Sequence, residues 1–407
     1  MSAHAHPKAI GGKLLDPTMK ILLGLFGIAA VVMVYRFFTG IGPVSNMTDG
    51  YAWGIWEPIN VVVFTGIGAG AYSVGLLCYL LNKGKYHPYV RPAVLVGAIA
   101  YSLGGSSIVI ALGRYWNAYW LPAVPIWNLN SVLLEVAVCV ISYVLVLWVE
   151  VLPAVLDGAA SSKSPGWSRF GAKWGQRLSK AMPFVIALAV VLPTMHQSSL
   201  GGLMLIATTK VDPLWHTWAL PLLALISCLS MGYGTVVVLT NILGMTWKAK
   251  YDQALFADMS KVNGGLLFLF SAIRLGDIVV QGKLHYLGRL DHHLFFFVLE
   301  MALFLVPAFM FFSPKVQQNR GRLFAAALMA IAAGALWRVD AYLTCYNAGE
   351  GWEYFPSMGE TIVTIGMAAI GIAVFIFVSR LFPVVVVDDA HRHSNVGADQ
   401  VRSAASR

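Results

Sequence analysis

The stretch Pro58 to Asn82, PINVVVFTGIGAGAYSVGLLCYLLN, contains no Asp, Glu, Lys or Arg. A helix that crosses the roughly 30 Å hydrocarbon core of a membrane needs about 20 consecutive, mostly apolar residues. This stretch therefore predicts a membrane-spanning helix. The same absence of these four residue types marks three further predicted spans: Pro92 to Gly113, Thr217 to Trp247 and Thr361 to Ser379.

Six other apolar stretches complete a predicted set of ten spans. Hydrophobic residues make up 58% of the chain and charged residues only 12%, which excludes an ordinary soluble domain. The predicted fold class is an all-α, polytopic membrane protein. It has a short N-terminal segment (1–18), a transmembrane domain (19–383) and a polar tail expected to be disordered (384–407). The six stretches are 19–40, 127–150, 181–208, 293–313, 323–346 and 261–282, the last being the weakest because Arg274 and Asp277 interrupt it.

The distribution of Lys and Arg predicts how the chain is oriented. Cytoplasmic loops of membrane proteins carry an excess of these residues. With ten spans, both termini and the four even-to-odd loops share one side, which holds 21 of the 28 Lys and Arg, against 7 on the other side. Both termini are therefore predicted to be cytoplasmic. The net charge of +9 is explained by these loops and requires no nucleic-acid partner.

Cysteine and histidine positions restrict the cofactors of this chain. The four cysteines, at positions 78, 139, 228 and 345, are tens of residues apart, which argues against an iron–sulfur cluster or another metal site within the chain. Of ten histidines, only His196 lies deep inside a predicted span. A membrane b-type haem normally takes two axial histidines from the spans, so the sequence disfavours a haem as well.

The most informative polar segment lies in the predicted helix 181–208, where Pro193 is followed by His196, Gln197 and Ser198. Proline cannot donate a backbone hydrogen bond and kinks a helix, which frees a carbonyl group one turn earlier. An imidazole can donate to a quinone carbonyl and exchange protons near neutral pH. We therefore predict that His196 is a catalytic group, although a histidine bonded to a neighbouring helix for packing alone is the alternative.

Other ionisable residues also lie toward the outer ends of the predicted spans. Glu135 follows about one turn after Asn130 and Ser131, so it is either a proton-transfer group or an acid that compensates the helix dipole. Arg114 stands beside Tyr115 and Trp116, a combination that also occurs in interfacial anchoring belts. Intramembrane charges usually pair with one another or line water. Arg274 with Asp277, and Arg338 with Asp340, are close enough in sequence to pair within one helix, and Glu300 completes this proton-path or ion-pair set.

Several motifs resemble those of one known family, the HybB-type branch of the NrfD/PsrC superfamily of integral membrane subunits. The resemblance extends over nearly the whole chain. The motifs are Tyr86-His87-Pro88-Tyr89-Val90-Arg91-Pro92, Tyr101-Ser102-Leu103-Gly104-Gly105, Gly113-Arg114-Tyr115-Trp116-Asn117, Asn130 to Glu135, Leu192 to Ser199, and Tyr354-Phe355-Pro356.

This resemblance implies a fold, a function and a set of partners. Such subunits have two four-helix bundles with flanking helices, and they bind menaquinone or ubiquinone near the outer face of the bacterial inner membrane. Electrons come from a periplasmic ferredoxin-like iron–sulfur subunit. The main catalytic centre lies on another subunit, a nickel–iron hydrogenase for the HybB type. Besides membrane lipid, these subunits are the expected partners, and the quinone site is expected at His196, Gln197, Glu135, Arg114 and Ser198.

Two alternatives remain open at this point. A closely similar subunit, DsrP, belongs to a sulfite-reductase-associated complex of sulfur metabolism and shares most of these motifs. An ion or solute transporter would also have about ten helices and intramembrane charges. However, a transporter site should be reachable from both sides, whereas the polar residues here lie toward the outer face.

Overall fold

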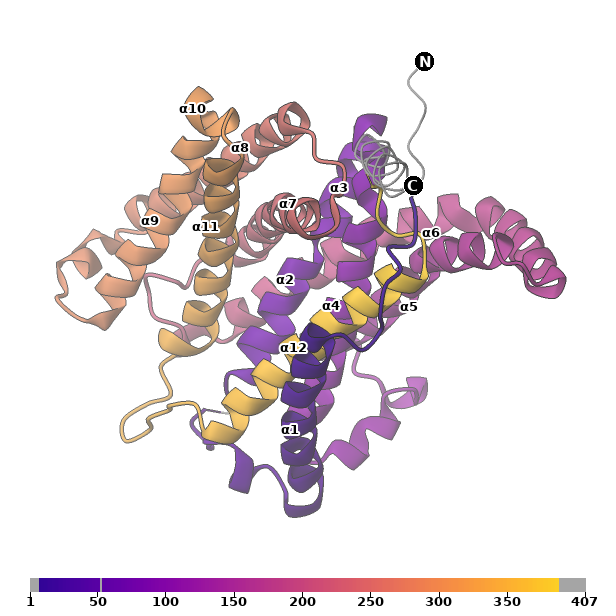
Figure 1. Ribbon diagram of the computed structural model, residues 1–407. Helices are drawn as coiled ribbons and strands as arrows, with labels where there is room; N and C mark the ends of the chain where they lie inside the picture. Colours follow the sequence, from indigo (N-terminus) through magenta and orange to yellow (C-terminus); the bar gives the residue numbers. More distant parts are fainter. Residues whose placement is uncertain (1–6, 52, 388–407) are drawn as a thin grey trace.

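The computed structural model describes residues 7–51 and 53–387, and within them ten helical segments are long and apolar enough to cross a membrane (Figure 1). The predicted all-α, polytopic fold is therefore confirmed. The extended pieces in the described part form isolated β-bridges only. The predicted disordered tail lies, from residue 388 onward, outside the described residues.

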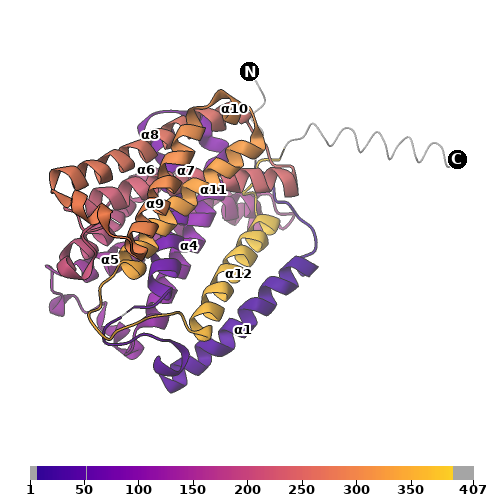
Figure 2. The same cartoon turned by 90° about the vertical axis from the view of Figure 1, so that its left-hand side faces the viewer.

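Eight of the ten spans form two consecutive groups of four, and the first and last spans pack together beside them (Figure 2). The flanking pair consists of α1 (Pro17–Thr39) and α12 (Met358–Leu381). The first group contains the second span (Trp56–Leu80, which includes α2, Phe64–Gly68, and α3, Gly70–Gly75), α4 (Val90–Ala111), α5 (Val132–Ala160) and α6 (Pro165–Ile206). The second group contains α7 (Leu220–Trp247), α8 (Gln253–Val280), α9 (His292–Phe312) and α11 (Arg320–Val339), with the short α10 (Pro314–Gln317) before α11.

The two groups meet where α7 packs against α3 and α6. Glycine makes the close crossing of α3 and α7 possible, because a Cβ atom on Gly232 would lie 2.6 Å from the carbonyl oxygen of Ala69. Small residues let membrane helices approach closely and gain packing contacts. Glycines of the second span also pack closely on α7, since a Cβ atom on Gly66 would lie 2.8 Å from Met231 and one on Gly70 would lie 3.2 Å from Val236. This span begins and ends with π-helical segments, Trp56–Val63 and Leu76–Leu80.

The two ends of the described chain lie on the same face of the molecule. The Lys8 amide donates to the Val385 carbonyl oxygen at 2.9 Å, so the segment before α1 meets the segment after α12. Val387 forms a β-bridge with Ala249, which directly follows α7. An even number of spans with both ends on one face agrees with the topology predicted from the charges.

Helices α5 and α6 are longer than the apolar stretches that predicted them. The predicted span 127–150 is α5, Val132–Ala160, and the predicted span 181–208 is α6, Pro165–Ile206. Hydropathy detects only the part of a helix that lies in hydrocarbon, whereas the backbone continues helical through flanking polar residues. At about 1.5 Å per residue, the 42 residues of α6 extend about 63 Å, roughly twice the hydrocarbon thickness.

Candidate functional site

Arg338 is a fully buried cation at the junction of the two groups of helices. Its Nη1 donates to the Ser227 hydroxyl (3.0 Å) and its Nη2 donates to Gln197 Oε1 (3.2 Å) and the Ala224 carbonyl (3.2 Å). All of these acceptors are neutral, and no carboxylate of the described chain lies within ion-pair distance. A buried charge is costly unless it is paired, so this guanidinium is an unusual local feature.

The predicted pairing of Arg338 with Asp340 is wrong. Residues two apart on a helix point in nearly opposite directions. Asp340 begins the π-helical segment Asp340–Thr344 that continues α11, and its carboxylate is buried with no hydrogen-bond partner among the described residues. The two charges therefore belong to different sides of α11.

The predicted pairing of Arg274 with Asp277 is also wrong. Arg274 Nη2 donates to Glu300 Oε1 at 3.1 Å, and Glu300 Oε2 accepts from Trp215 Nε1 at 2.7 Å, all within the buried part of the second group. Asp277 instead pairs with Lys283 at 3.3 Å. Arg274 pairs with Glu300 because the two side chains face each other across the contact between α8 and α9. The spacing of residues along the sequence does not reveal this contact.

Gln197 connects the buried cation to the first group of helices. Its side-chain amide donates to the Tyr101 hydroxyl at 3.1 Å and lies 3.4 Å from the Thr65 hydroxyl, while its carbonyl oxygen accepts from Arg338. These four side chains come from α4, the second span, α6 and α11. They form a continuous polar chain through an otherwise apolar interior, which we call the Gln197 chain (Thr65, Tyr101, Gln197 and Arg338).

His196 lies directly beside this chain and is fully buried. Its ring packs edge-on against Tyr101 with centroids 5.5 Å apart. Neither ring nitrogen has a hydrogen-bond partner in the described part of the molecule. Because buried polar groups are almost always bonded, two ring nitrogens without a partner argue against the packing-only interpretation of His196.

A small cleft opens beside the Gln197 chain between α6, α7 and α11, with about 10 Å³ of open space. Two of its lining residues carry buried N–H groups without a partner among the described residues, Trp337 at Nε1 and Arg338 at Nε. Both groups lie behind the apolar lining of the cleft, so a ligand with oxygen acceptors would reach these donors and the positive charge only when lining side chains move. The other lining residues include Gln197, Leu200, Met204 and Tyr342.

The remaining predicted site residues lie outside this cleft. Glu135 is exposed on α5, and its Oε1 accepts from the Ser199 hydroxyl at 2.6 Å. Ser199 is three residues beyond His196 on α6, so Glu135 is connected to the same helix but does not contact the imidazole. Arg114 is exposed after α4, and the Ser198 hydroxyl donates to the Met195 carbonyl of its own helix.

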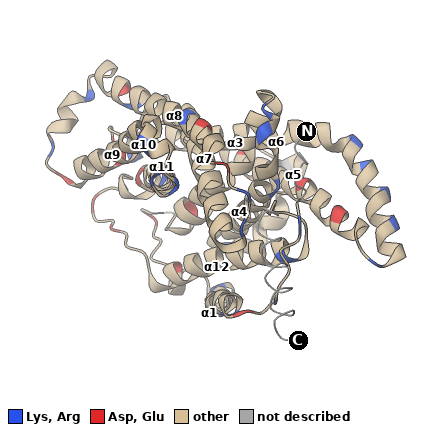
Figure 3. Ribbon diagram, turned by 45° about the horizontal axis from the view of Figure 1, so that its top comes forward, with Lys and Arg blue, Asp and Glu red and all other residues tan. Residues whose placement is uncertain are grey.

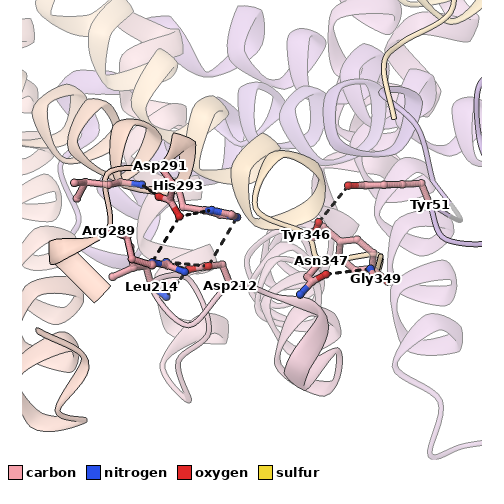
Figure 4. A network of polar contacts seen from close by, with 10 residues as sticks. Tyr51, Asp212, Leu214, Arg289, Asp291, His293, Tyr346, Asn347 and Gly349 are labelled. Carbon is pink, nitrogen blue, oxygen red and sulfur yellow. Dashed lines mark hydrogen bonds and ion pairs between the residues drawn. The ribbon is translucent and has the colours of Figure 1, made fainter. Parts of the chain in front are cut away.

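A network on the face opposite the termini, in the loops of the second group and the first turn of α9, was not predicted from the sequence. Arg289 Nη2 donates to both oxygens of Asp212 at 3.0 Å, and His293 bridges Asp212 (3.8 Å) and Asp291 (3.2 Å) (Figure 4). The Leu294 amide, the His293 ring and the Arg289 charge lower the pKa of Asp291. Asp212, Arg289 and Asp291 lie in loops and His293 lies in the first turn of α9, and no periodic pattern brings residues of such distant sequence positions together.

A second polar contact on the same face joins the start of α12 to the loop before the second span. The Tyr354 hydroxyl donates to Glu360 Oε1 at 2.6 Å and accepts from the Ile55 amide at 2.8 Å. Burial and the adjacent Glu360 carboxylate raise the pKa of Tyr354. Glu360 also completes a capping box with Ser357 at the start of α12.

Ten helices of the described chain are long and apolar enough to cross a membrane, and they surround a buried basic and polar cluster, which defines a multi-pass integral membrane protein. The chain belongs to the NrfD polysulphide reductase family, whose pattern it matches over residues 43–343. It is 35% identical over 394 residues to the probable Ni/Fe-hydrogenase 2 b-type cytochrome subunit of Escherichia coli, covering 95% of this chain and 98% of that protein. It is also 26% identical over 371 residues to a menaquinone reductase integral membrane subunit of Nitratidesulfovibrio vulgaris, covering 85% and 86% of the two chains.

The name of the Escherichia coli relative raises the question of a haem. Among the described histidines, His87, His216, His285, His292 and His293 lie at helix ends or in loops, and none belongs to the buried surroundings of His196. The described part also contains no group of three or more His, Cys, Asp or Glu that could hold a metal ion. The residues around His196 therefore do not fit a bis-histidine haem.

Proposed function

We propose that this chain is the quinone-reactive membrane subunit of a respiratory oxidoreductase complex, and that it exchanges electrons between an iron–sulfur partner and membrane quinone. The observation that supports this most is the unpaired, buried Arg338 guanidinium beside the bare His196 ring and the small cleft. The names of the two relatives support a role in a hydrogenase or reductase complex.

The chemistry of a quinone matches these donors. Reduction adds two electrons and two protons, and negative charge develops on the two oxygens before they are protonated. A positive charge fixed in a low-dielectric site stabilises such an oxygen more strongly than it would in water. Arg338 would hold one oxygen, and His196 would donate a proton to or accept a proton from the same molecule.

The space beside these residues requires side chains to move when the ring binds. The open volume of about 10 Å³ is enough for about one water molecule, not for a quinone ring. Leu200 and Met204 line the cleft, and methionine is unbranched and adapts its shape easily. Binding would displace these flexible side chains while the Gln197 chain stays fixed by its hydrogen bonds.

Glu135 would serve proton exchange at the outer end of this site. It is exposed and it accepts from Ser199, which lies on α6 one turn beyond His196. Arg114 and Ser198, which do not line the cleft, would act at the entrance. The basic face would be the cytoplasmic one, so both termini would lie in the cytoplasm of a bacterium. The site, in the outer part of α6, would then lie toward the periplasm.

The proposed partners follow from that orientation. A periplasmic ferredoxin-like iron–sulfur subunit would deliver electrons to the outer face, and a nickel–iron hydrogenase would carry the main catalytic centre. The menaquinone reductase relative favours a second candidate, a reductase complex of another kind with the same membrane chemistry. In either case the quinone would be menaquinone or ubiquinone, and no haem would be bound by this chain.

Purification of the complex from the native membrane tests this proposal. We expect an iron–sulfur protein and bound quinone to accompany the chain, and the subunit separated from its partners to show no b-haem absorption. A nickel–iron or other catalytic subunit in the same preparation would distinguish the two candidate complexes. A preparation in which the chain carries neither quinone nor any redox partner would contradict the proposal and favour a transporter.

A further inference from the structure

The first sixteen residues of α6, 165–180, form a segment whose surroundings differ from those of the other spans. One face packs on the end of α5, where Ser168 donates to the Ala160 carbonyl at 2.9 Å and a Cβ atom on Gly171 would lie 2.6 Å from the Leu156 carbonyl oxygen. The rest of this segment is largely exposed. It therefore has one fixed face and a broad free surface.

Aromatic residues occupy the part of the free surface next to the α5 contact. Trp167, Phe170 and Trp174 follow one another at helical spacings of three and four residues, and their rings lie 5.8 and 6.2 Å apart. They are 61%, 46% and 44% exposed. Tryptophan rings are enriched at the level of lipid headgroups, where one end is apolar and the other is hydrated.

Basic residues occupy the part of the surface opposite the α5 contact. Arg169, Lys173, Arg177 and Lys180 recur at intervals of three or four residues, and Figure 3 shows a row of blue positions along this segment at the right edge. The Arg177 guanidinium lies over the Trp174 ring at 5.0 Å. From Gly158 to Val211 the sequence contains no Asp or Glu, and none of these four cations has an ion pair in the described structure.

The depth of the segment follows from its neighbours. Arg91, at the start of α4, pairs with Asp157 at 2.6 Å and donates to the Pro383 carbonyl, just beyond α12, at 3.0 Å. The ends of α4, α5 and α12 thus lie at one level, which marks the boundary of the membrane on the basic side. Since Gly171 contacts the same turn of α5, the aromatic and basic stripes lie at that boundary and not far out in water.

We propose that residues 165–180 form a binding site for anionic phospholipid headgroups, with the aromatic stripe among the acyl chains and the basic stripe on the phosphates. Each Lys or Arg near an anionic membrane surface strengthens the attraction, and long basic side chains reach from the hydrocarbon edge to the headgroups. The site is separate from the quinone cleft and does not depend on the proposed function. Charge complementarity, the lack of a local acid and the boundary depth favour lipid over an acidic protein.

The test compares retention of phosphatidylglycerol and phosphatidylcholine by the purified full-length chain in mild detergent, using native mass spectrometry with equal amounts of both lipids. We expect the wild-type protein to retain the anionic lipid preferentially. In the triple variant R169Q/K173Q/R177Q, the ratio of retained phosphatidylglycerol to phosphatidylcholine should fall about tenfold. The matched control, K250Q/K315Q/R322Q, removes three exposed cations elsewhere on the same face and should change the preference by less than about threefold.

Salt provides a second measurement that needs no variant. Raising the ionic strength from about 0.1 M to about 1 M shortens the screening length about threefold, so the wild-type preference for phosphatidylglycerol should fall. Equal retention of the two lipids by wild type would overturn the proposal even if the triple variant fails to fold. Equal losses in the triple variant and its matched control would also overturn it, because the attraction would then belong to the whole basic face.

Discussion

Replacing Arg338 by methionine should lower quinone turnover without lowering the stability of the protein. The guanidinium is buried, it donates only to neutral acceptors, and it has no acidic partner in the described chain. Removing an uncompensated buried charge relieves a desolvation penalty of several kcal/mol, and methionine is a good apolar substitute for an arginine stem. Loss of the hydrogen bonds to Gln197, Ser227 and the Ala224 carbonyl costs about 1–3 kcal/mol each, so the two effects offset each other in the free energy of unfolding.

The effect of the same substitution on activity follows from the hydrogen bond that Arg338 would make to the reduced quinone. A hydrogen bond to a charged group contributes about 1.5–3 kcal/mol. At about 1.4 kcal/mol per tenfold change, Arg338→Met should lower kcat/KM for a soluble quinone analogue by about 10- to 150-fold. Arg338→Lys keeps the charge but not the planar donor geometry, and should lose less.

The assay is quinone reduction by the assembled complex, together with the thermal midpoint of the purified protein. Arg274→Met is the matched control, because Arg274 is equally buried but is paired with Glu300. Its loss leaves a buried carboxylate unpaired, so stability should fall by about 3–5 kcal/mol. Near-normal turnover by Arg338→Met, or a loss of stability as large as that of Arg274→Met, would refute the reasoning.

Three further predictions concern the imidazole, the buried pair and the topology. His196→Ala and Glu135→Gln should each slow quinone turnover in assembled complexes, as measured by steady-state kinetics, and the loss for His196→Ala should be about 10²-fold or more. Normal rates in both variants would place proton transfer at other residues. The double variant with Arg274→Met and Glu300→Leu should be more stable in thermal unfolding than Arg274→Met alone, because no unpaired buried charge remains. Purely additive losses of stability would argue against pairing of the two residues. A reporter fused after residue 407 should give a cytoplasmic signal, whereas a periplasmic signal would reverse the proposed orientation.

The sequence was sufficient for the helices because hydropathy reports directly on transfer into hydrocarbon. Even the weakest stretch, which Arg274 and Asp277 interrupt, is one continuous helix of 28 residues. The ends of α5 and α6 were misplaced because a helix continues past the point where its residues stop being apolar. Polarity marks the membrane boundary, whereas hydrogen bonding and capping residues decide where a helix ends.

The candidate site was only partly accessible to sequence reasoning. His196 and Gln197 stood out because they follow Pro193 in a span, and the structure places them at the centre of the polar interior. Arg338 was recognised as important but was given the wrong partner, since its side-chain acceptors Gln197 and Ser227 lie on α6 and α7, more than 100 residues away in sequence.

Tyr101, Thr65 and Trp337 were missed as members of the site. These side chains are neutral, so they do not stand out in an apolar span as a charged residue does. A usable signal did exist for Tyr101, which belongs to one of the motifs shared with the family. Thr65 and Trp337 became visible only when packing placed one beside the Gln197 amide and the other in the wall of the cleft.

The central claim is that quinone binds in the cleft between α6, α7 and α11, next to Arg338 and Gln197. Photolabelling of the assembled complex with an azido-quinone, followed by peptide mapping, tests this location most directly. We predict label within Gln197 to Met204 or Trp337 to Tyr342, with the labelling competed by excess natural quinone. Competable labelling confined to the flanking pair α1 and α12, or to the network around Asp212, would contradict the account.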